Sequence, residues 1–347
     1  MGSPFFSNDT YFGIDIGDSS LKMVELKKQG PRLVLVNYGF TENLSNIQFT
    51  KLEDVDYLAA AINKVRHEAG IKSKKAVVSL PAFSVFSSII NIVNNDRKIL
   101  PEAVREEARK VIPLPLDEMI LDWKIIPSAD GKETNNLSIF LTGSPKKLVR
   151  RYIEIFSRAR LELVSLETET FSLIRCLMGD DQSTVMIVEI GSNSTDIVIV
   201  KESIPIISRS LEVCSRTITG ILASSMSISF AKAEQFKLDL GLTFNANSKT
   251  IDLPPVVITA VQPILNEIQY MLEFFASNYK GKVDKIILSG GGAMMFGLRE
   301  YLSSRLDMSV FVGDPWARVD CSVELKDVVS EVGPRLAVAI GLAMREV

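Results

Sequence analysis

Two stretches of the chain combine carboxylates, glycine and small hydroxyls in a way that suits phosphate and metal binding. In the first, the apolar segment 11–16 carries Asp15 and runs into a polar turn, and an apolar segment resumes at Leu21. This pattern predicts a β-hairpin whose turn exposes backbone N–H groups to a phosphate, although an ordinary hairpin with a polar turn has the same pattern. The candidate ligands are Asp15 for a hydrated Mg²⁺, and Gly17, Ser19, Ser20 and Lys22 for the phosphates.

The second stretch, residues 185–200, repeats this plan. Glu189 and Gly191 stand where Asp15 and Gly17 stand in the first, and a small polar turn again precedes an apolar segment. Two such hairpins about half a chain apart predict two similar domains that face one nucleotide. The candidates here are Glu189, as a metal ligand and catalytic residue, and Gly191, Ser192, Asn193 and Thr195 as phosphate ligands.

A third element is the glycine run within residues 286–302. An apolar, strand-like segment leads through Gly290, Gly291 and Gly292 into a helical pattern. Such a turn suits close contact with the adenosine or a phosphate of a nucleotide, although its spacing is not that of a Rossmann fingerprint. The three elements together, in this order, are stronger evidence for a nucleotide site than any one of them alone.

In this order, the three elements resemble the actin-like ATPase fold shared by actin, Hsp70, sugar kinases and FtsA. Nearly the whole chain is similar to the PilM family of type IV pilus assembly, most specifically over residues 102–123, EAVREEARKVIPLPLDEMILDW. The resemblance implies an α/β fold of two lobes with duplicated ribonuclease H-like cores and an inserted α+β subdomain. It also implies ATP and Mg²⁺ as ligands, and as partner the short cytoplasmic N-terminal tail of a PilN-like bitopic membrane protein.

The same resemblance and the pattern of elements divide the chain into two lobes and an insert. The insert reads as strand, helix, strand, strand, helix. The predicted parts are 1–81 for the first lobe core (1A), completed by 161–184 and 331–347; 82–160 for the insert (1C); and 185–330 for the second lobe (2A), with a small subdomain 2B around 222–260.

Composition agrees with this division. A chain of 347 residues with 46% hydrophobic and 23% charged residues is long for one core. The net charge of −3 gives no sign of a nucleic-acid surface. Apolar runs of strand length, no signal-peptide pattern and three well-separated cysteines predict a cytoplasmic protein. The family resemblance implies that it reaches the inner membrane only through partners. His67 is the one histidine, so histidine-based catalysis is excluded.

Further site residues are implied by the family resemblance. Glu169 stands at the connection into the second hairpin, where actin-like ATPases often carry a group that orients water; a merely solvated acid is the alternative. Glu234 and Lys237 lie in a motif that resembles one near the ribose and adenine, with an ordinary exposed pair as the alternative. At Cys214 and Ser215 the chain departs from the paired glycines of PilM and FtsA, which predicts a less permissive turn.

The insert carries the most family-specific residues and no catalytic motif, so we expect it to recognise the partner. The resemblance places a groove between the first lobe and the insert. In that groove Arg105 and Arg109 could hold an acidic residue of the tail, and the tail could cover Leu114 and Leu116. The alternative is that these leucines only pack the insert onto the lobe.

Turnover of ATP is expected to be slow or absent. Asp18 adds a negative charge to the first phosphate turn, and one like-charge contact at about 4 Å costs about 4 kcal/mol at an effective dielectric constant of about 20. Two other functions stay open. One is an FtsA-like division filament protein, a class with a membrane-anchoring amphipathic helix that this sequence does not show; the other is a small-molecule kinase, which needs a substrate-side base that no motif picks out. Self-association stays open as well.

Overall fold

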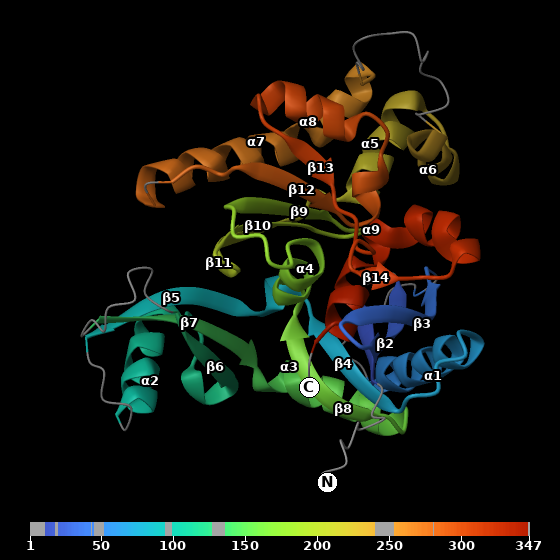
Figure 1. Cartoon of the computed structure of the whole chain (residues 1–347). Helices are drawn as coiled ribbons and strands as arrows, with labels where there is room; N and C mark the ends of the chain where they lie inside the picture. The colour runs from blue at the N-terminus through green and yellow to red at the C-terminus, as the bar shows by residue number, and fades with distance from the viewer. Residues whose placement is uncertain are drawn as a thin grey trace.

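The computed structural model describes residues 11–17, 20–42, 44, 52–93, 99–126, 136–239, 253–279 and 281–345. Two sheets, each flanked by helices, form the two lobes, and a third, smaller sheet lies beside the first lobe (Figure 1). Asp18 and Ser19 of the first turn lie outside the described residues, as does most of the expected loop 240–253.

The first lobe is built on a six-stranded sheet around the predicted first hairpin. Its first two strands are antiparallel, and the first strand also pairs in parallel with β4. Two helices cover one face, namely α1 (Leu52–Glu68) and α3 (Lys146–Arg158). The sheet order is β14 (Val319–Asp320), β3 (Arg32–Thr41), β2 (Leu21–Gln29), β1 (Tyr11–Ile16), β4 (Lys75–Leu80) and β8 (Glu162–Thr168).

The second lobe repeats this plan. Its hairpin is again antiparallel, and the first strand of the hairpin again has a parallel neighbour on its other side. The two halves thus have duplicated cores, as predicted. The sheet order is β11 (Ile204–Leu211), β10 (Thr195–Lys201), β9 (Val185–Ile190), β12 (Lys285–Ser289) and β13 (Val310–Val312).

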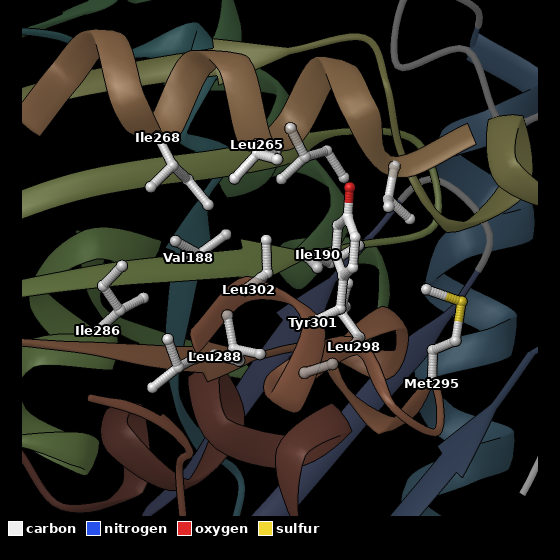
Figure 2. Close-up of a cluster of buried hydrophobic side chains, with 14 of the residues drawn as sticks. Val188, Ile190, Leu265, Ile268, Ile286, Leu288, Met295, Leu298, Tyr301 and Leu302 are labelled. Atoms are coloured by element: carbon white, nitrogen blue, oxygen red, sulfur yellow. The ribbon is translucent and has the colours of Figure 1, made fainter. Parts of the chain in front are cut away.

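The outer face of the second sheet is covered by helices that share one hydrophobic core. Figure 2 shows part of this core, with Val188 and Ile190 of β9 close to Leu298 and Leu302 of α8. The alternation of apolar residues along β9 and β12 places one set in this core and the other set toward the first lobe. The helices are α5 (Ser215–Met226), α6 (Phe230–Asp239), α7 (Pro255–Tyr279) and α8 (Leu298–Leu306).

Two helices lie between the sheets of the two lobes: α4 (Glu169–Leu177) and α9 (Lys326–Ala343). Their buried side chains form one core with residues of both sheets. At Gly13 of β1 a Cβ atom would lie 2.2 Å from the carbonyl oxygen of Ala339, so glycine lets α9 approach the strand that leads into the first turn.

The insert is a three-stranded antiparallel sheet with one helix, α2 (Leu100–Val111), packed on it. The predicted pairing of its last two strands is confirmed. The strands are β5 (Phe86–Val93), β7 (Asn136–Pro145) and β6 (Met119–Ile126), in that spatial order.

Two elements pack differently from the predicted division of the chain. Helix α3, which was assigned to the insert, buries Tyr152, Ile155 and Phe156 in the core of the first lobe. Strand β14, which was assigned to the second lobe, pairs with β3 of the first. The domain limits stay a prediction, and these packings argue for ending the insert at β7.

Three expectations drawn from composition concern thiols, histidine and membrane spans. Cys176, Cys214 and Cys321 are free thiols. His67 is exposed near the end of α1. None of the helices in the described ranges has both the length and the apolarity to cross a membrane.

Candidate functional site

The turns of the two hairpins line one cavity between the lobes. Each turn closes with the same hydrogen bond, because Gly17 N donates to Ser20 O and Gly191 N donates to Ser194 O, both at 2.9 Å. The empty space between its walls, open solvent included, is about 540 Å³. The predicted residues that line it are Asp15, Gly17, Ser20, Lys22, Glu169, Glu189, Gly191, Ser192 and Asn193.

Asp15 is buried at the end of β1 and already has partners for both carboxylate oxygens. Lys22 Nζ donates to Oδ2 and Ser79 Oγ donates to Oδ1, each at 2.9 Å. Burial lowers the pKa of Lys22, but the nearby Asp15 carboxylate opposes this and the net shift is upward. Lys22 is therefore committed to Asp15, and the roles predicted for the two residues toward metal and phosphate stay predictions.

Three further carboxylates converge beside this ion pair. Glu169 at the start of α4, Glu189 at the end of β9 and Asp196 on β10 each offer an oxygen within 4.8 Å of the others. We call these three residues the carboxylate cluster. Asp196 was missed by the sequence reasoning, although it stands directly opposite Glu189 in the hairpin register.

Burial raises the pKa values of all three carboxyl groups of this cluster, and neighbouring negative charges raise those of Glu169 and Glu189 further. The pKa of Glu189 rises to about 8, first through burial and then through Asp196 and Asp15. Burial, followed by the charges of Glu189 and Asp15, raises the pKa of Glu169 well above its ordinary value. Burial also raises the pKa of Asp196, against hydrogen bonds from Ser210 and Ser194. Without a cation, the cluster retains protons that free carboxylates would lose.

The donor set fits a divalent cation. Mg²⁺ prefers oxygen ligands and is typically held by one or two carboxylates with water and phosphate oxygens. Asp196 Oδ1 is buried and has no hydrogen-bond partner among the described residues, so the lone pairs of this oxygen are left for a ligand. The cluster has only Lys22 as a nearby cation in the cavity lining, and Lys22 already pairs with Asp15.

The glycine run packs against the second hairpin. Gly290 has φ +81°, and a Cβ atom there would lie 2.5 Å from the carbonyl oxygen of Ile190. At Gly292 a Cβ atom would lie 2.2 Å from the Ile190 side chain, whereas Gly291 has ordinary room. A short 3₁₀ turn, η4 (Gly291–Met294), follows the run before α8 begins. None of the three glycines lines the described cavity, so their role toward a nucleotide stays a prediction.

Glu234 and Lys237 tie α6 to α5. Lys237 is only 4% exposed, and its Nζ donates to Glu234 Oε2 and Thr219 Oγ1 at 2.9 Å and to Ser215 Oγ at 2.7 Å. The pair is thus not an ordinary exposed one. It lies outside the lining of the described cavity, and its contact with ribose or adenine stays a prediction.

The departure from paired glycines causes no backbone strain. Cys214 has φ −148° and ψ 178°, an extended conformation that any residue adopts. Its Sγ accepts from Thr217 N at 3.5 Å and caps α5, and Ser215 N donates to Gly191 O at 3.0 Å. The loss of the paired glycines therefore imposes no strain at Cys214 in this conformation.

The predicted partner residues of the insert differ in their surroundings. Arg105 pairs with Asp117, and Arg109 pairs with Glu106 at 2.6 Å. Leu114 is 50% exposed, whereas Leu116 packs against the core of the insert. Of the two leucines, Leu114 is therefore the more exposed.

A groove runs between the insert and the first lobe. One wall is the 3₁₀ turn η2 (Leu116–Glu118), the floor includes Pro145 at the end of β7, and the other wall is α3. We call it the α3 groove. None of the predicted groove residues Arg105, Arg109, Leu114 and Leu116 lines it, and the partner groove stays a prediction. The charged residues that line the α3 groove are Asp117, Glu118, Lys146, Lys147, Arg150, Arg151 and Glu154.

A family model described as "Type IV pilus assembly protein PilM" matches residues 13–347. The chain belongs to this family. The match covers both hairpins, the glycine run and the insert, so it does not depend on the fold alone. The sequence-based prediction of the PilM family is confirmed, and the FtsA-like and kinase alternatives lose their support.

Solved structures share the fold over nearly the whole chain. A "PilM-PilN type IV pilus biogenesis complex" is similar with a TM-score of 0.82, 24% identity, and coverage of 96% of this chain and 98% of that one. The ethanolamine utilization protein EutJ from Carboxydothermus hydrogenoformans has a TM-score of 0.57, 15% identity, and 96% and 89% coverage. MreB 5 of Spiroplasma citri bound to AMPPNP has a TM-score of 0.52, 12% identity, and 96% and 95% coverage. The predicted actin-like fold is thereby confirmed.

Proposed function

We propose that the protein is an actin-like ATP-binding component of type IV pilus, or related secretion, machinery. In this role it binds the N-terminal cytoplasmic tail of a PilN-like inner-membrane protein. The observation that carries the proposal is the cavity in which both phosphate-type turns and the carboxylate cluster meet, in a chain of the PilM family. The similar PilM–PilN complex supports the choice of partner.

The nucleotide is proposed to bind between the two turns. The N–H groups around Gly17 and Gly191 would face its phosphates from both lobes, as turns of this kind do for anions. Glu189, Asp196 and Glu169 would hold Mg²⁺, which supplies the positive charge that lets a polyphosphate approach this acidic cavity. Lys22 keeps Asp15 in place and its charge neutralised.

Slow turnover is part of the proposal. Glu169 is the residue placed to orient a water molecule, but its Oε2 already accepts a hydrogen bond from Ala82 N at 2.9 Å. We therefore propose that ATP acts chiefly as a bound ligand that sets the arrangement of the lobes.

The tail is proposed to lie in the α3 groove, which opens between the insert and the first lobe. Exposed Leu114 is near the η2 wall in sequence, and an extended tail could add backbone hydrogen bonds along a strand edge of the insert. Through this tail the protein would sit at the cytoplasmic face of the inner membrane.

Thermal melting with and without Mg-ATP tests the nucleotide part. We expect roughly 2.7 kcal/mol of stabilisation at a hundredfold excess over the dissociation constant. Asp196→Asn should lose most of this gain because the cluster loses a charge, whereas Asp180→Asn, on an exposed loop, should keep it. No shift of wild-type protein at millimolar Mg-ATP, with copurified nucleotide excluded, would refute the claim.

A further inference from the structure

One buried lysine ties helix α6 to helix α5. Lys237, near the end of α6, is only 4% exposed, and its Nζ lies among four acceptor atoms. They are Glu234 Oε2 and Thr219 Oγ1, each at 2.9 Å, Ser215 Oγ at 2.7 Å and Ser215 O at 3.2 Å. An ammonium group has three protons, so these acceptors take up its whole donor capacity. In this conformation Lys237 joins two helices and has no proton left for a ligand.

The first residues of α5 hold the turn of the second hairpin. Ser215 N donates to Gly191 O at 3.0 Å. Arg216 N donates to Ser192 O at 3.2 Å. A peptide unit is planar and trans, so a fixed carbonyl also fixes the direction of the N–H group on the same plane. These two planes carry the N–H groups of Ser192 and Asn193, which line the nucleotide cavity. Helix α5 therefore determines which way two N–H groups of this turn point.

Ser215 takes part in both sets of contacts. Its hydroxyl and its carbonyl accept from Lys237, and its own N–H donates to Gly191. A continuous path of hydrogen bonds thus runs from Lys237 through Ser215 to the second phosphate turn. The chain departs from paired glycines at this place, and a glycine at position 215 would lack the hydroxyl that Lys237 contacts.

The electrostatic position of Lys237 suits a turn that binds an anion. Its Nζ contacts Ser215 and Thr219 at the N-terminal end of α5. This end of a helix carries a positive partial charge, which disfavours a neighbouring cation and favours an anion. Glu234 supplies one negative charge, at 2.9 Å from Nζ. Phosphate oxygens held by the turn that α5 contacts would supply more negative charge at the same end.

We propose that Lys237 is a positioning residue for the second phosphate turn. Through Ser215 it holds the start of α5 against Gly191 and Ser192, and it does not itself contact the nucleotide. The inference rests on the proposed function and assigns a role within that site. Without Lys237 or the Ser215 hydroxyl, the start of α5 is held less firmly. The bound phosphates must then order the turn themselves, which lowers the affinity.

A direct contact of Lys237 with the ribose would give a different pattern of affinities. A residue that positions the phosphate turn affects all nucleotides with the same phosphates by the same factor. A residue that bonds to the ribose hydroxyls affects only the nucleotides that have them. Mg-ATP and Mg-2′,3′-dideoxy-ATP carry the same triphosphate and differ in these hydroxyls, so this pair of probes separates the two roles.

The variants remove one part of the path at a time. Lys237→Met keeps most of the aliphatic chain and removes the ammonium group. Lys232→Met makes the same change on the exposed face of α6 and is the matched control. Ser215→Ala removes only the hydroxyl and keeps the N–H of position 215 for Gly191, and Ser215→Thr puts a hydroxyl back.

The experiment measures the dissociation constants of both probes for the full chain. Lys237→Met should bind both at least about tenfold more weakly, the low end of the effect of outer partners of metal ligands. Ser215→Ala should bind both at least about threefold more weakly, because it removes one hydrogen bond of the path. Ser215→Thr should restore the affinity, and Lys232→Met should bind as wild type does. The ratio of the two dissociation constants should be the same in every variant.

A loss of affinity confined to Mg-ATP would assign Lys237 to the ribose and overturn the proposal. Unchanged affinity in Ser215→Ala would overturn it as well, because Lys237 would then not act through Ser215, and so would a Ser215→Thr protein that stays weak. If Lys237→Met does not fold, the two Ser215 variants decide. Failure of the proposed function has a different appearance, since wild type would then bind neither probe at millimolar concentration.

Discussion

The two hairpins place different charges at equivalent register positions. Asp15 stands opposite Lys22 in the first, whereas Glu189 stands opposite Asp196 in the second. The first pair neutralises itself at 2.9 Å. The second pair brings two acids together in a partly buried place; burial raises the pKa of both, and the charge of Asp196 raises the pKa of Glu189 further. The second hairpin is therefore the one whose paired carboxylates a bound cation would stabilise.

Glu189→Gln should make the metal-free protein more stable at high pH. The folded-state pKa of Glu189, about 8, lies above its ordinary value of 4.5, so its contribution to stability is complete below about pH 4.5 and is lost as pH rises through 8. The amide does not ionise, so the variant should gain at least about 1 kcal/mol over wild type at pH 8.5, and less at pH 5.

Urea unfolding in chelator at the two pH values measures this gain. Glu162→Gln, at an exposed position on β8, should follow wild type at both. A Glu189→Gln protein that is less stable than wild type at pH 8.5 would show that the carboxylate is already compensated.

At the scale of elements, α3 has two distinct faces. Tyr152, Ile155 and Phe156 are fully buried against the first lobe. Lys147 and Arg150 are exposed and line the α3 groove. One face therefore holds the helix rigidly while the other offers charged side chains to a partner, so charge changes on the second face should leave stability intact.

Lys147→Glu combined with Arg150→Glu should weaken tail binding at least about tenfold, since reversing charges in a binding groove costs more than about 1.4 kcal/mol. The measurement is titration of the labelled tail peptide. Lys232→Glu, on the exposed face of α6, is the matched control and should bind normally.

Leu114→Asp tests the neighbouring η2 side, and Leu116 is unsuitable because it packs against the core of the insert. Unchanged tail affinity in the charge-reversal variant and in Leu114→Asp would place the tail outside the α3 groove. The Mg-ATP melting shift should survive in all of these variants.

At the scale of the whole molecule, the lobes share the core that α4 and α9 form between the two sheets. The helices cross closely at Gly341, where a Cβ atom would lie 2.1 Å from the carbonyl oxygen of Ser172. Arg175 of α4 also donates to Gly341 O at 2.6 Å and pairs with Glu167. The arrangement of the two hairpin turns around the cavity depends on this crossing.

Gly341→Ala should destabilise the protein by about 1–3 kcal/mol or more, because backbone atoms cannot move aside as a flexible side chain can. Gly220→Ala on α5 is the control, since nothing lies within 4 Å of its Cβ position, and it should be neutral or stabilising by up to about 1 kcal/mol. Urea unfolding measures both. Equal stability of the two variants would contradict the close crossing.

Much of the local structure could be predicted because its signals are local. The alternation of apolar residues, the polar turns and the glycine run located both hairpins and β12, and the helical periodicity located α1, α2 and α3. The short strands β13 and β14 were not predicted, because two or three residues carry no periodicity and pair only when a neighbouring strand is already present. The packing of α3 on the first lobe was not predicted, because helical periodicity shows that a helix has an apolar face but not which element that face packs against.

The duplicated hairpins and the candidate carboxylates Asp15 and Glu189 could be read from residue types at short spacings, whereas the family resemblance implied Glu169 as a candidate. The approach of Asp196 to Glu169 and Glu189, and the hydrogen bond from Ala82 to Glu169, became evident only from the folded chain. The physical reason is that hydrogen bonds and charge repulsion act over a few ångströms in space, and folding brings Ala82 and Glu169 together across 87 residues of chain.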